Sequence, residues 1–331
     1  MVTEVSHVII LYGGEEEADI SIISATYIHR HLESIKNIKP QIQVELINLN
    51  DYANIVGFSN FLVSKYNPSN TFIIPCVHGH PGESGLLPFL LDQLNFRYLG
   101  CNFHGSNKCF NKITTKLWCK EFEIPVTPYI VVNESNYIHH KHKILQFFNK
   151  CNKHVFVKAP NQGSSIGCFS ANSKESLMQS IEKSFRFNKH VLIEEKIKGR
   201  EIEVAAFTYQ GNLVLSRPGE IFTNGNFYDF NKKYNKNSDI KTMTNTKLKN
   251  STREQLLHFS KIAFEQFELE DLSRIDFFVN EEENLIYLNE INTFPGMTPV
   301  SMFPKMMEDS GVSFKDYIYD KLKLGVNNEK N

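Results

Sequence analysis

The order of apolar and polar positions in the first hundred residues predicts alternating strands and helices. Apolar runs at 7–12, 43–49 and 71–79 have the length of buried strands, and two glycines close the first run. Between the first two runs, apolar residues of segment 15–35 recur at helical spacing. This alternation is typical of a mostly parallel α/β sheet, in which ligands lie at the carboxyl ends of the strands. Those ends are Gly13–Gly14 and segment 78–85.

The rest of the chain predicts a mixed α/β (α+β) fold with further domains. Helices are expected at 111–122, 174–187 and 251–267, a hairpin at 273–291, and one amphipathic helix at the C-terminus. Segment 223–249 is polar and rich in Asn and Lys, and we expect a mobile loop there. The predicted domains are 1–100, 101–195 and 196–331.

Composition narrows the classes of partner. The 331 residues are 41% hydrophobic and 22% charged, with a formal net charge of -1, so no overall charge favours nucleic acid or an anionic membrane. No apolar run approaches the ~20 residues of a membrane span, and no signal-peptide pattern occurs at the N-terminus, so we expect a cytoplasmic protein. The six cysteines form no CxxC pair and are expected to be reduced.

The predicted hairpin carries the strongest chemical signal. Strand alternation places Arg274 and Asp276 on one face, and Glu290 and Asn292 on one face of the partner strand. Such an oxygen cluster suits Mg²⁺ that bridges phosphates. A solvent-exposed polar face with a surface ion pair would explain the spacing equally well, but the Pro-Gly turn that follows offers N–H groups to an oxyanion and favours the site. The same alternation points Asn289 away.

Two further segments are weaker signals. Lys158 ends a strand, and loop 163–167 (GSSIG) is rich in donors for phosphate, although it is not a P-loop and a Gly/Ser surface loop is the alternative. Segment 194–197 could offer backbone groups and one carboxylate to adenine, with Glu201 placed for ribose. A solvated charged turn is the alternative there.

Together these segments resemble the ATP-grasp superfamily, and within it the D-alanine–D-alanine ligases. Nine segments match in the family's order: LYGGEEEADIS, HGHPGESG, NKITTK, VKAPNQGSSIG, VLIEEKIKGREIEVA, PGEI, FYDFNKKY, RIDFFV and NEINTFPGMTPVSMFP. The resemblance implies a three-domain ATP-grasp architecture with a lid in 223–249. It also implies D-alanine and ATP as substrates, two Mg²⁺ (or Mn²⁺) ions and a homodimer.

The implied reaction makes D-alanyl-D-alanine for peptidoglycan. ATP phosphorylates the carboxylate of one D-alanine, and the amine of a second attacks the acyl phosphate. One alternative is a related ligase that joins other amino acids, such as D-Ala with D-Ser. Another is a nucleotide-binding regulator without catalysis, although binding alone would not need Arg274 at an oxyanion.

The resemblance assigns roles on the nucleotide side. Phosphate contacts fall on Lys112, Lys158, Ser165 and Lys233; base and ribose contacts on Glu194, Ile197 and Glu201; metal ligands on Asp276, Glu290 and Asn292; and the oxyanion contacts on Arg274 and the Gly296 backbone.

The resemblance also assigns the amino-acid side. Glu17 matches the carboxylate that binds the first D-alanine's ammonium group, with Glu15 and Glu16 as alternatives, and it forms a triad with Ser164 and Tyr234. His78 and Glu83 match residues that face the substrates, and Ser301 with Met302 matches the site of the second carboxylate. Departures such as GES in place of the usual Gly-Glu-Asp leave the lid conformation and the second-substrate specificity open.

Overall fold

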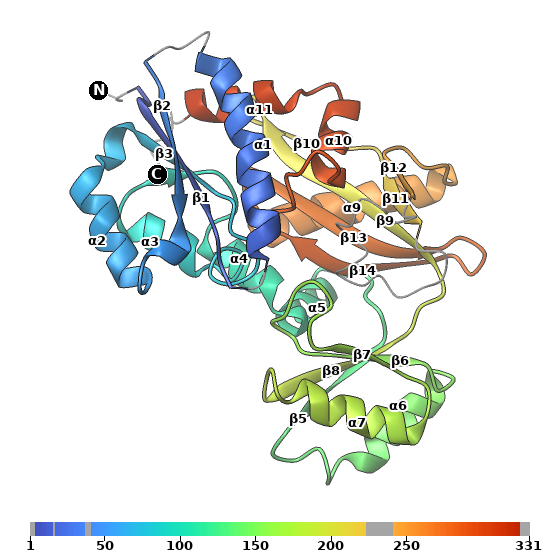
Figure 1. The fold of residues 1–331 in the computed structure, drawn as a ribbon. Coiled ribbons are helices and arrows are strands. Elements are labelled where there is room, and N and C mark those ends of the chain that lie inside the picture. The colour runs from blue at the N-terminus through green and yellow to red at the C-terminus, as the bar shows by residue number, and fades with distance from the viewer. Residues whose placement is uncertain (1–3, 16, 37–40, 223–240, 325–331) are drawn as a thin grey trace.

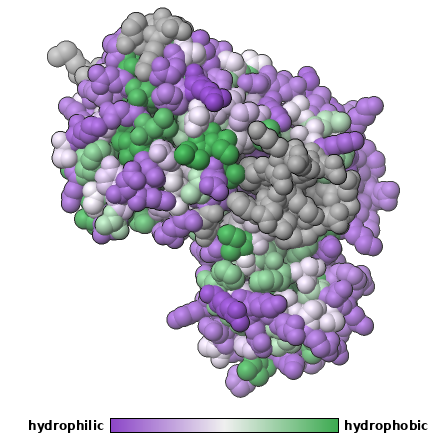
Figure 2. Space-filling view, in the orientation of Figure 1, coloured by the Kyte–Doolittle hydropathy of each residue, from purple (hydrophilic) through white to green (hydrophobic). Residues whose placement is uncertain are grey.

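Three sheets follow one another along the chain (Figure 1). The structure, a computed structural model, describes residues 4–15, 17–36, 41–222 and 241–324. The visible surface is mainly hydrophilic, with scattered apolar residues, and the part that holds the second sheet forms a smaller lobe (Figure 2). Among the described helices, none is long and apolar enough to cross a membrane.

The first sheet is parallel, as the sequence predicts. Its order is β2-β1-β3-β4. The strands are β1 (His7–Tyr12), β2 (Gln43–Asn48), β3 (Thr71–Pro75) and β4 (Arg97–Tyr98). Alternate residues of β1 bury opposite ways: Val8 and Ile10 pack with α1 (Ala18–Lys36), whereas Ile9 and Leu11 pack with α2 (Ile55–Lys65) and α3 (Leu86–Gln93). The sheet is therefore covered on both faces.

The second sheet is antiparallel, with the order β5-β8-β6-β7. Its strands are β5 (Tyr129–Asn133), β6 (Val155–Lys158), β7 (Cys168–Ala171) and β8 (His190–Glu195), and α6 (Lys141–Lys150) and α7 (Lys174–Ser184) share its core. Strand β7 was not predicted, because the glycine loop masks its start. The helices α4 (Phe103–Phe110) and α5 (Lys112–Glu121) precede this sheet.

The third sheet has six strands and carries most of the polar site. Its path is β12-β11-β9-β13-β14, and β10 pairs with β9. The strands are β9 (Arg200–Tyr209), β10 (Asn212–Leu215), β11 (Gly219–Phe222), β12 (Lys241–Met243), β13 (Leu272–Asn280) and β14 (Leu285–Asn292). Helix α9 (Asn250–Gln266) packs on one face. The C-terminus forms two helices, α10 (Met302–Asp309) and α11 (Phe314–Leu324), where one was predicted, because Gly311 (φ 86°) ends the first in a left-handed turn.

One hydrophobic core joins the two ends of the chain. Val8 and Ala25 of the first sheet and its helix belong to the same buried cluster as Phe207, Phe303 and Tyr317. The first and third sheets therefore hold each other in a fixed position, whereas the second sheet has a core of its own. The predicted domain boundaries stay a prediction, although each sheet falls within one of the three predicted ranges.

Candidate functional site

A cavity of about 450 Å³ lies between the second and third sheets. Strands β6 and β8 form one wall, and β9, β13 and β14 form the other. The structure brings most of the predicted nucleotide residues to this cavity. Its lining includes Lys112, Lys158, Ser164, Ser165, Glu194, Ile197, Glu201, Arg274, Asp276 and Glu290.

Lysine side chains surround a buried carboxylate at the wall that the second sheet forms. The Lys158 ammonium lies 2.5 Å from one carboxylate oxygen of Glu194, and the Lys116 ammonium lies 2.8 Å from the other. Glu194 is 3% exposed and lies in β8, so its carboxylate does not belong to a solvated turn, although Lys196 of the same segment is exposed. Although burial alone would raise it, the two ammonium groups hold the pKa of Glu194 at about 2. The carboxylate is therefore ionised, and each of its oxygens contacts one lysine ammonium group.

Lys112 is the first residue of α5 and follows the capping residue Asn111. The Asn111 side chain accepts hydrogen bonds from the N–H groups of Ile113 and Thr114, which fixes where the helix starts. The Lys112 ammonium donates to the carbonyl of Gln162 at 2.7 Å. Lys112 thus holds the residue that precedes the glycine-rich loop, and it also lines the cavity.

The loop at 163–167 has a strained backbone. Ser164 and Ser165 have φ of 49° and 65°, a left-handed conformation that is uncommon for residues with a side chain. The Ser164 hydroxyl donates to a carboxylate oxygen of Glu17, from the segment after β1. The predicted pairing of Glu17 with Ser164 therefore exists, and Glu15 is exposed. A loop tied to a distant segment and bent this way is not an ordinary Gly/Ser surface loop.

A cluster of carboxylates with one guanidinium lines the cavity from the third sheet. Arg274 donates to both oxygens of Asp276 at 2.8 and 2.7 Å, and the Asn292 amide donates to Asp276 at 2.9 Å. In the β13–β14 register Arg274 pairs with Asn292, and Asp276 with Glu290. Arg274 and Asp276 are 6% and 8% exposed, so the solvent-exposed hairpin considered above is wrong.

Glu203 belongs to this cluster and was missed from the sequence. It lies opposite Asp276 in the β9–β13 register, and its carboxylate lies 3.3 Å from Arg274 Nε. Although burial would lower it, Asp276 and Glu203 raise the pKa of Arg274 well above its usual value. Period-two alternation from Glu201 was the available signal, because it predicts that Glu203 shares the cavity face.

Asn289 contradicts strict alternation. The β13–β14 register shifts between Asp276 and Phe277, so that Phe277 faces Leu288 and Asn289 is left without a partner position on β13. This is a β-bulge, which turns a side chain from its expected face. Asn289 lines the cavity together with Glu290, so the prediction that it points away is wrong.

The side-chain oxygens of Asp276, Glu290 and Asn292 fit a hard cation. Two carboxylates and an amide meet in facing strand positions, and oxygen is the ligand that Mg²⁺ prefers. Among the described residues no group of three or more His, Cys, Asp or Glu side chains could hold a metal by itself. A cation here would thus need other oxygens as well, such as those of phosphate.

A smaller hollow of about 50 Å³ adjoins the cavity, between the loop at 163 and the carboxylate cluster. Glu83, Gly163, Glu290 and Asn292 are among its lining residues. Burial, helped by the charges of Glu17 and Glu290, raises the pKa of Glu83 to about 7. The Gly79 N–H donates to this carboxyl at 2.8 Å.

His78 holds the turn that contains Gly296. Its Nδ1 lies 3.1 Å from the carbonyl of Phe294, and its Nε2 lies 3.4 Å from Ser24 Oγ, which accepts from the N–H of Met297 at 3.2 Å. His78 is 4% exposed. His78 therefore contacts the turn from the protein interior.

Ser301 and Met302 begin α10. The Ser301 hydroxyl lies 2.7 Å from Thr298 Oγ1 and accepts from the N–H of Thr298. The Met302 side chain is buried in the shared core, against Gly219. A ligand could therefore meet the Met302 backbone but not its side chain.

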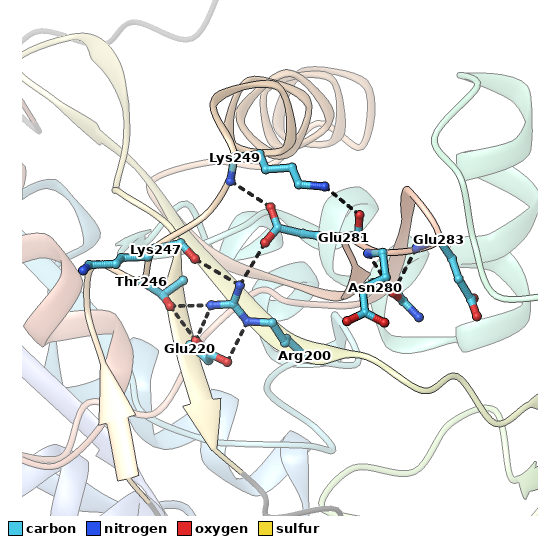
Figure 3. Close-up of polar contacts among 9 residues, drawn as sticks. Arg200, Glu220, Thr246, Lys247, Lys249, Asn280, Glu281 and Glu283 are labelled. Carbon is cyan, nitrogen blue, oxygen red and sulfur yellow. Dashed lines mark hydrogen bonds and ion pairs between the residues drawn. The ribbon is translucent and has the colours of Figure 1, made fainter.

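Arg200, next to Glu201, ties three segments together (Figure 3). Its guanidinium donates to both oxygens of Glu220, to Thr246 Oγ1, to the carbonyl of Lys247 and to Glu281. Figure 3 shows these partners coming from β11, the segment before α9 and the turn after β13. This network fixes the start of β9 and with it the position of Glu201.

The predictions for Lys233 and Tyr234 lie outside the described residues, as does most of the predicted lid at 223–249. Only its last part, residues 241–249, is described, and it includes β12.

Comparisons with known proteins agree with one another. The family model "D-ala D-ala ligase C-terminus" matches residues 118–322. The D-alanine–D-alanine ligase of Vibrio parahaemolyticus is 40% identical over 320 residues, 93% of this chain and 95% of the relative. That of Shewanella woodyi is 36% identical over 334 residues, 97% and 98% of the two chains. Among solved structures, D-alanyl-alanine synthetase A from Vibrio cholerae has a TM-score of 0.86 and 34% identity, covering 98% of this chain and 100% of that one.

Proposed function

This chain belongs to the D-alanine–D-alanine ligase family of ATP-grasp enzymes, and from that premise we propose that it joins two D-alanines with ATP to give D-alanyl-D-alanine for peptidoglycan precursors. The carboxylate of the first D-alanine takes the γ-phosphoryl group of ATP, which leaves ADP. The amine of the second attacks the acyl phosphate, and phosphate leaves as the amide bond forms.

The opposite charges that line one cavity carry this proposal. Lys112 and Lys158 supply cations to its lining, and Asp276 with Glu290 supplies carboxylates. A triphosphate that spans the cavity would meet ammonium groups directly and would meet the carboxylates through a cation. Phosphoryl transfer is catalysed mainly by such positioning and charge compensation.

The site residues keep the roles that the family resemblance gives them. Ile197 and Glu194 border the base, Glu201 the ribose, and Ser165 and Lys233 the phosphates. Asp276, Glu290 and Asn292 would hold two Mg²⁺ or Mn²⁺ ions, which neutralise phosphate charge when bound. Arg274 and the Gly296 N–H would stabilise the oxyanion of the tetrahedral intermediate. The buried Arg274–Asp276 pair supports this, because a fixed guanidinium needs no reorganisation during the reaction.

The amino-acid substrates would bind on the side of the smaller hollow. Glu17 takes the first ammonium group, and its hydrogen bond with Ser164 keeps that carboxylate beside the loop at 163–167. His78 and Glu83 support this region, and Ser301 with the Met302 backbone receives the second carboxylate, where helix N–H groups favour an anion. Tyr234 completes the triad with Glu17 and Ser164, and residues 223–249 serve as the lid that keeps water from the acyl phosphate.

The setting of the enzyme follows the same proposal. It works in the cytoplasm as a homodimer, with three domains divided near residues 100 and 195.

The test is to identify the product. Purified protein with Mg²⁺, ATP and an equimolar mixture of D-Ala, D-Ser, L-Ala and D-lactate is analysed by mass spectrometry, and phosphate release is measured with each substrate alone. D-alanyl-D-alanine should dominate. A product that contains D-Ser would support the related-ligase alternative, and activity with L-amino acids alone would contradict the proposal.

A further inference from the structure

Lys116 is a buried lysine that the function described above does not use. Its side chain is 2% exposed, and the ammonium group contacts Glu194 at 2.8 Å and Thr127 Oγ1 at 2.7 Å. Of the described lysines on α5, Lys112 lines the cavity and Lys116 does not. A buried ammonium is costly unless it is paired, so its retention here requires a reason.

The charges of the triad Lys116–Glu194–Lys158 do not balance in pairs. Glu194 gives one carboxylate oxygen to each lysine, at 2.8 Å for Lys116 and 2.5 Å for Lys158. If Lys116 were absent, Lys158 and Glu194 would form a neutral pair at the cavity wall. With Lys116 behind it, the triad carries one net positive charge, and the exposed member of the two cations is Lys158, 13% exposed against 2%.

We propose that Lys116 is a positioning residue that leaves the charge of Lys158 to the phosphates of the nucleotide by neutralising Glu194 from behind. Lys116 touches no substrate in this scheme. It acts through Glu194, whose second oxygen orients the Lys158 ammonium toward the cavity. The inference rests on the proposed function only in that the cavity binds a nucleoside triphosphate.

This role predicts a larger effect on phosphates than on the base, because the Glu194 carboxylate that borders the base stays in place. Lys116→Met keeps the length of the side chain and removes its charge, so Lys158 becomes half of a neutral pair. Affinity for Mg·ATP should fall by at least about tenfold, since the net positive charge beside the phosphates is lost. Affinity for adenosine should stay within about twofold of that of the original chain, since it carries no phosphate for Lys158.

Titration calorimetry without any amino acid measures both affinities. Lys120→Met is the matched control, because Lys120 lies one turn further along α5 and is exposed. Unchanged ATP affinity in a folded Lys116→Met variant would overturn the proposal. So would an equal loss for ATP and adenosine, which indicates general damage to the cavity.

A double variant keeps the test open if Lys116→Met does not fold. In Lys116→Met with Glu194→Gln, one positive and one negative charge leave together, so Lys158 again faces the phosphates with its full charge. Because Glu194 also borders the base, both affinities can fall together in this variant. The ratio of ATP to adenosine affinity should still equal that of the original chain, and a tenfold lower ratio would refute a role through Glu194. An original chain that binds ATP but makes no dipeptide would contradict the proposed function alone.

Discussion

Two buried ionic clusters belong to the two sheets that line the cavity, and their charge balance is opposite. At the second sheet two lysines share the carboxylate of Glu194. In the third sheet the single guanidinium of Arg274 contacts Asp276 and Glu203, with the charge of Glu290 also acting on it. The first cluster has a surplus of cations and the second a surplus of carboxylates.

This difference shows what burial is used for in each place. A buried ion pair seldom adds much to stability, because the desolvation of both charges offsets their attraction. Here the net charge of each cluster lies beside the cavity, where the cationic cluster can attract a phosphate and the acidic cluster a cation. The protein scaffold thus polarises one cavity with side chains that do not have to move.

The largest expected effect comes from removing a carboxylate of the cluster around Arg274. Glu290→Gln keeps the size of the side chain and leaves the Arg274–Asp276 pair intact, so the fold should survive. Turnover with Mg²⁺ should fall at least about 100-fold, because the cation loses an anionic ligand. Phosphate release measures this, with the exposed Asp309→Asn as control. Near-normal turnover would contradict the metal assignment.

The contribution of the cluster around Glu194 to stability should depend on pH in the acid range. Because the pKa of Glu194 is lowered to about 2, its ionised form stabilises the folded protein above the unfolded pKa near 4.5, and this contribution disappears as the pH falls toward 2. Glu194→Gln should therefore lower the free energy of unfolding by about 3 kcal/mol at pH 7.

Urea unfolding between pH 6 and pH 3 tests that sign. The gap between the original chain and Glu194→Gln should stay constant down to about pH 4.5 and narrow below it. Glu195→Gln, next in the chain and only partly buried, serves as control. A gap that does not narrow at the acid end of this range would mean that Glu194 is not held ionised by the lysines.

Glu17, in the segment after β1, should affect the binding of the amino acid and not that of the nucleotide. Glu17→Gln keeps a partner for the Ser164 hydroxyl but loses the charge proposed to bind an ammonium group. The KM for the first D-alanine should rise by about tenfold, and the affinity for ATP should not change. The same assay on the exposed Glu15→Gln decides between the two glutamates, and a larger effect there would reverse the assignment.

The smallest effect is expected at Arg200, which lies outside both clusters. About a third of its side chain is exposed, so Arg200→Met should lower the free energy of unfolding by only about 1 kcal/mol. The KM for ATP should rise a few-fold if the network of Figure 3 positions Glu201. Lys261→Met, which breaks the exposed pair with Glu265, is the control. Unchanged stability and KM would mean that β9 needs no such anchor.

Local pattern determined most of the elements and the residue types of the site. The chain pattern predicted β1 at 7–12 and a helix at 111–122, within a residue of the ends of β1 and α5. The motif order gave Lys112, Lys158, Glu201, Asp276 and Glu290, all of which line one cavity. These features are visible in sequence because secondary structure and motif chemistry depend on neighbours along the chain.

Contacts between distant segments decided the rest. The pairing of Lys116 with Glu194 joins a helix to a strand 78 positions later, and only the packing of α5 against the second sheet brings them together. Likewise, the bulge that turns Asn289 into the cavity depends on the register between β13 and β14, which alternation along one strand cannot reveal. The sequence alone therefore determined which groups were available, and the tertiary structure decided which charges are shared and which remain to face a ligand.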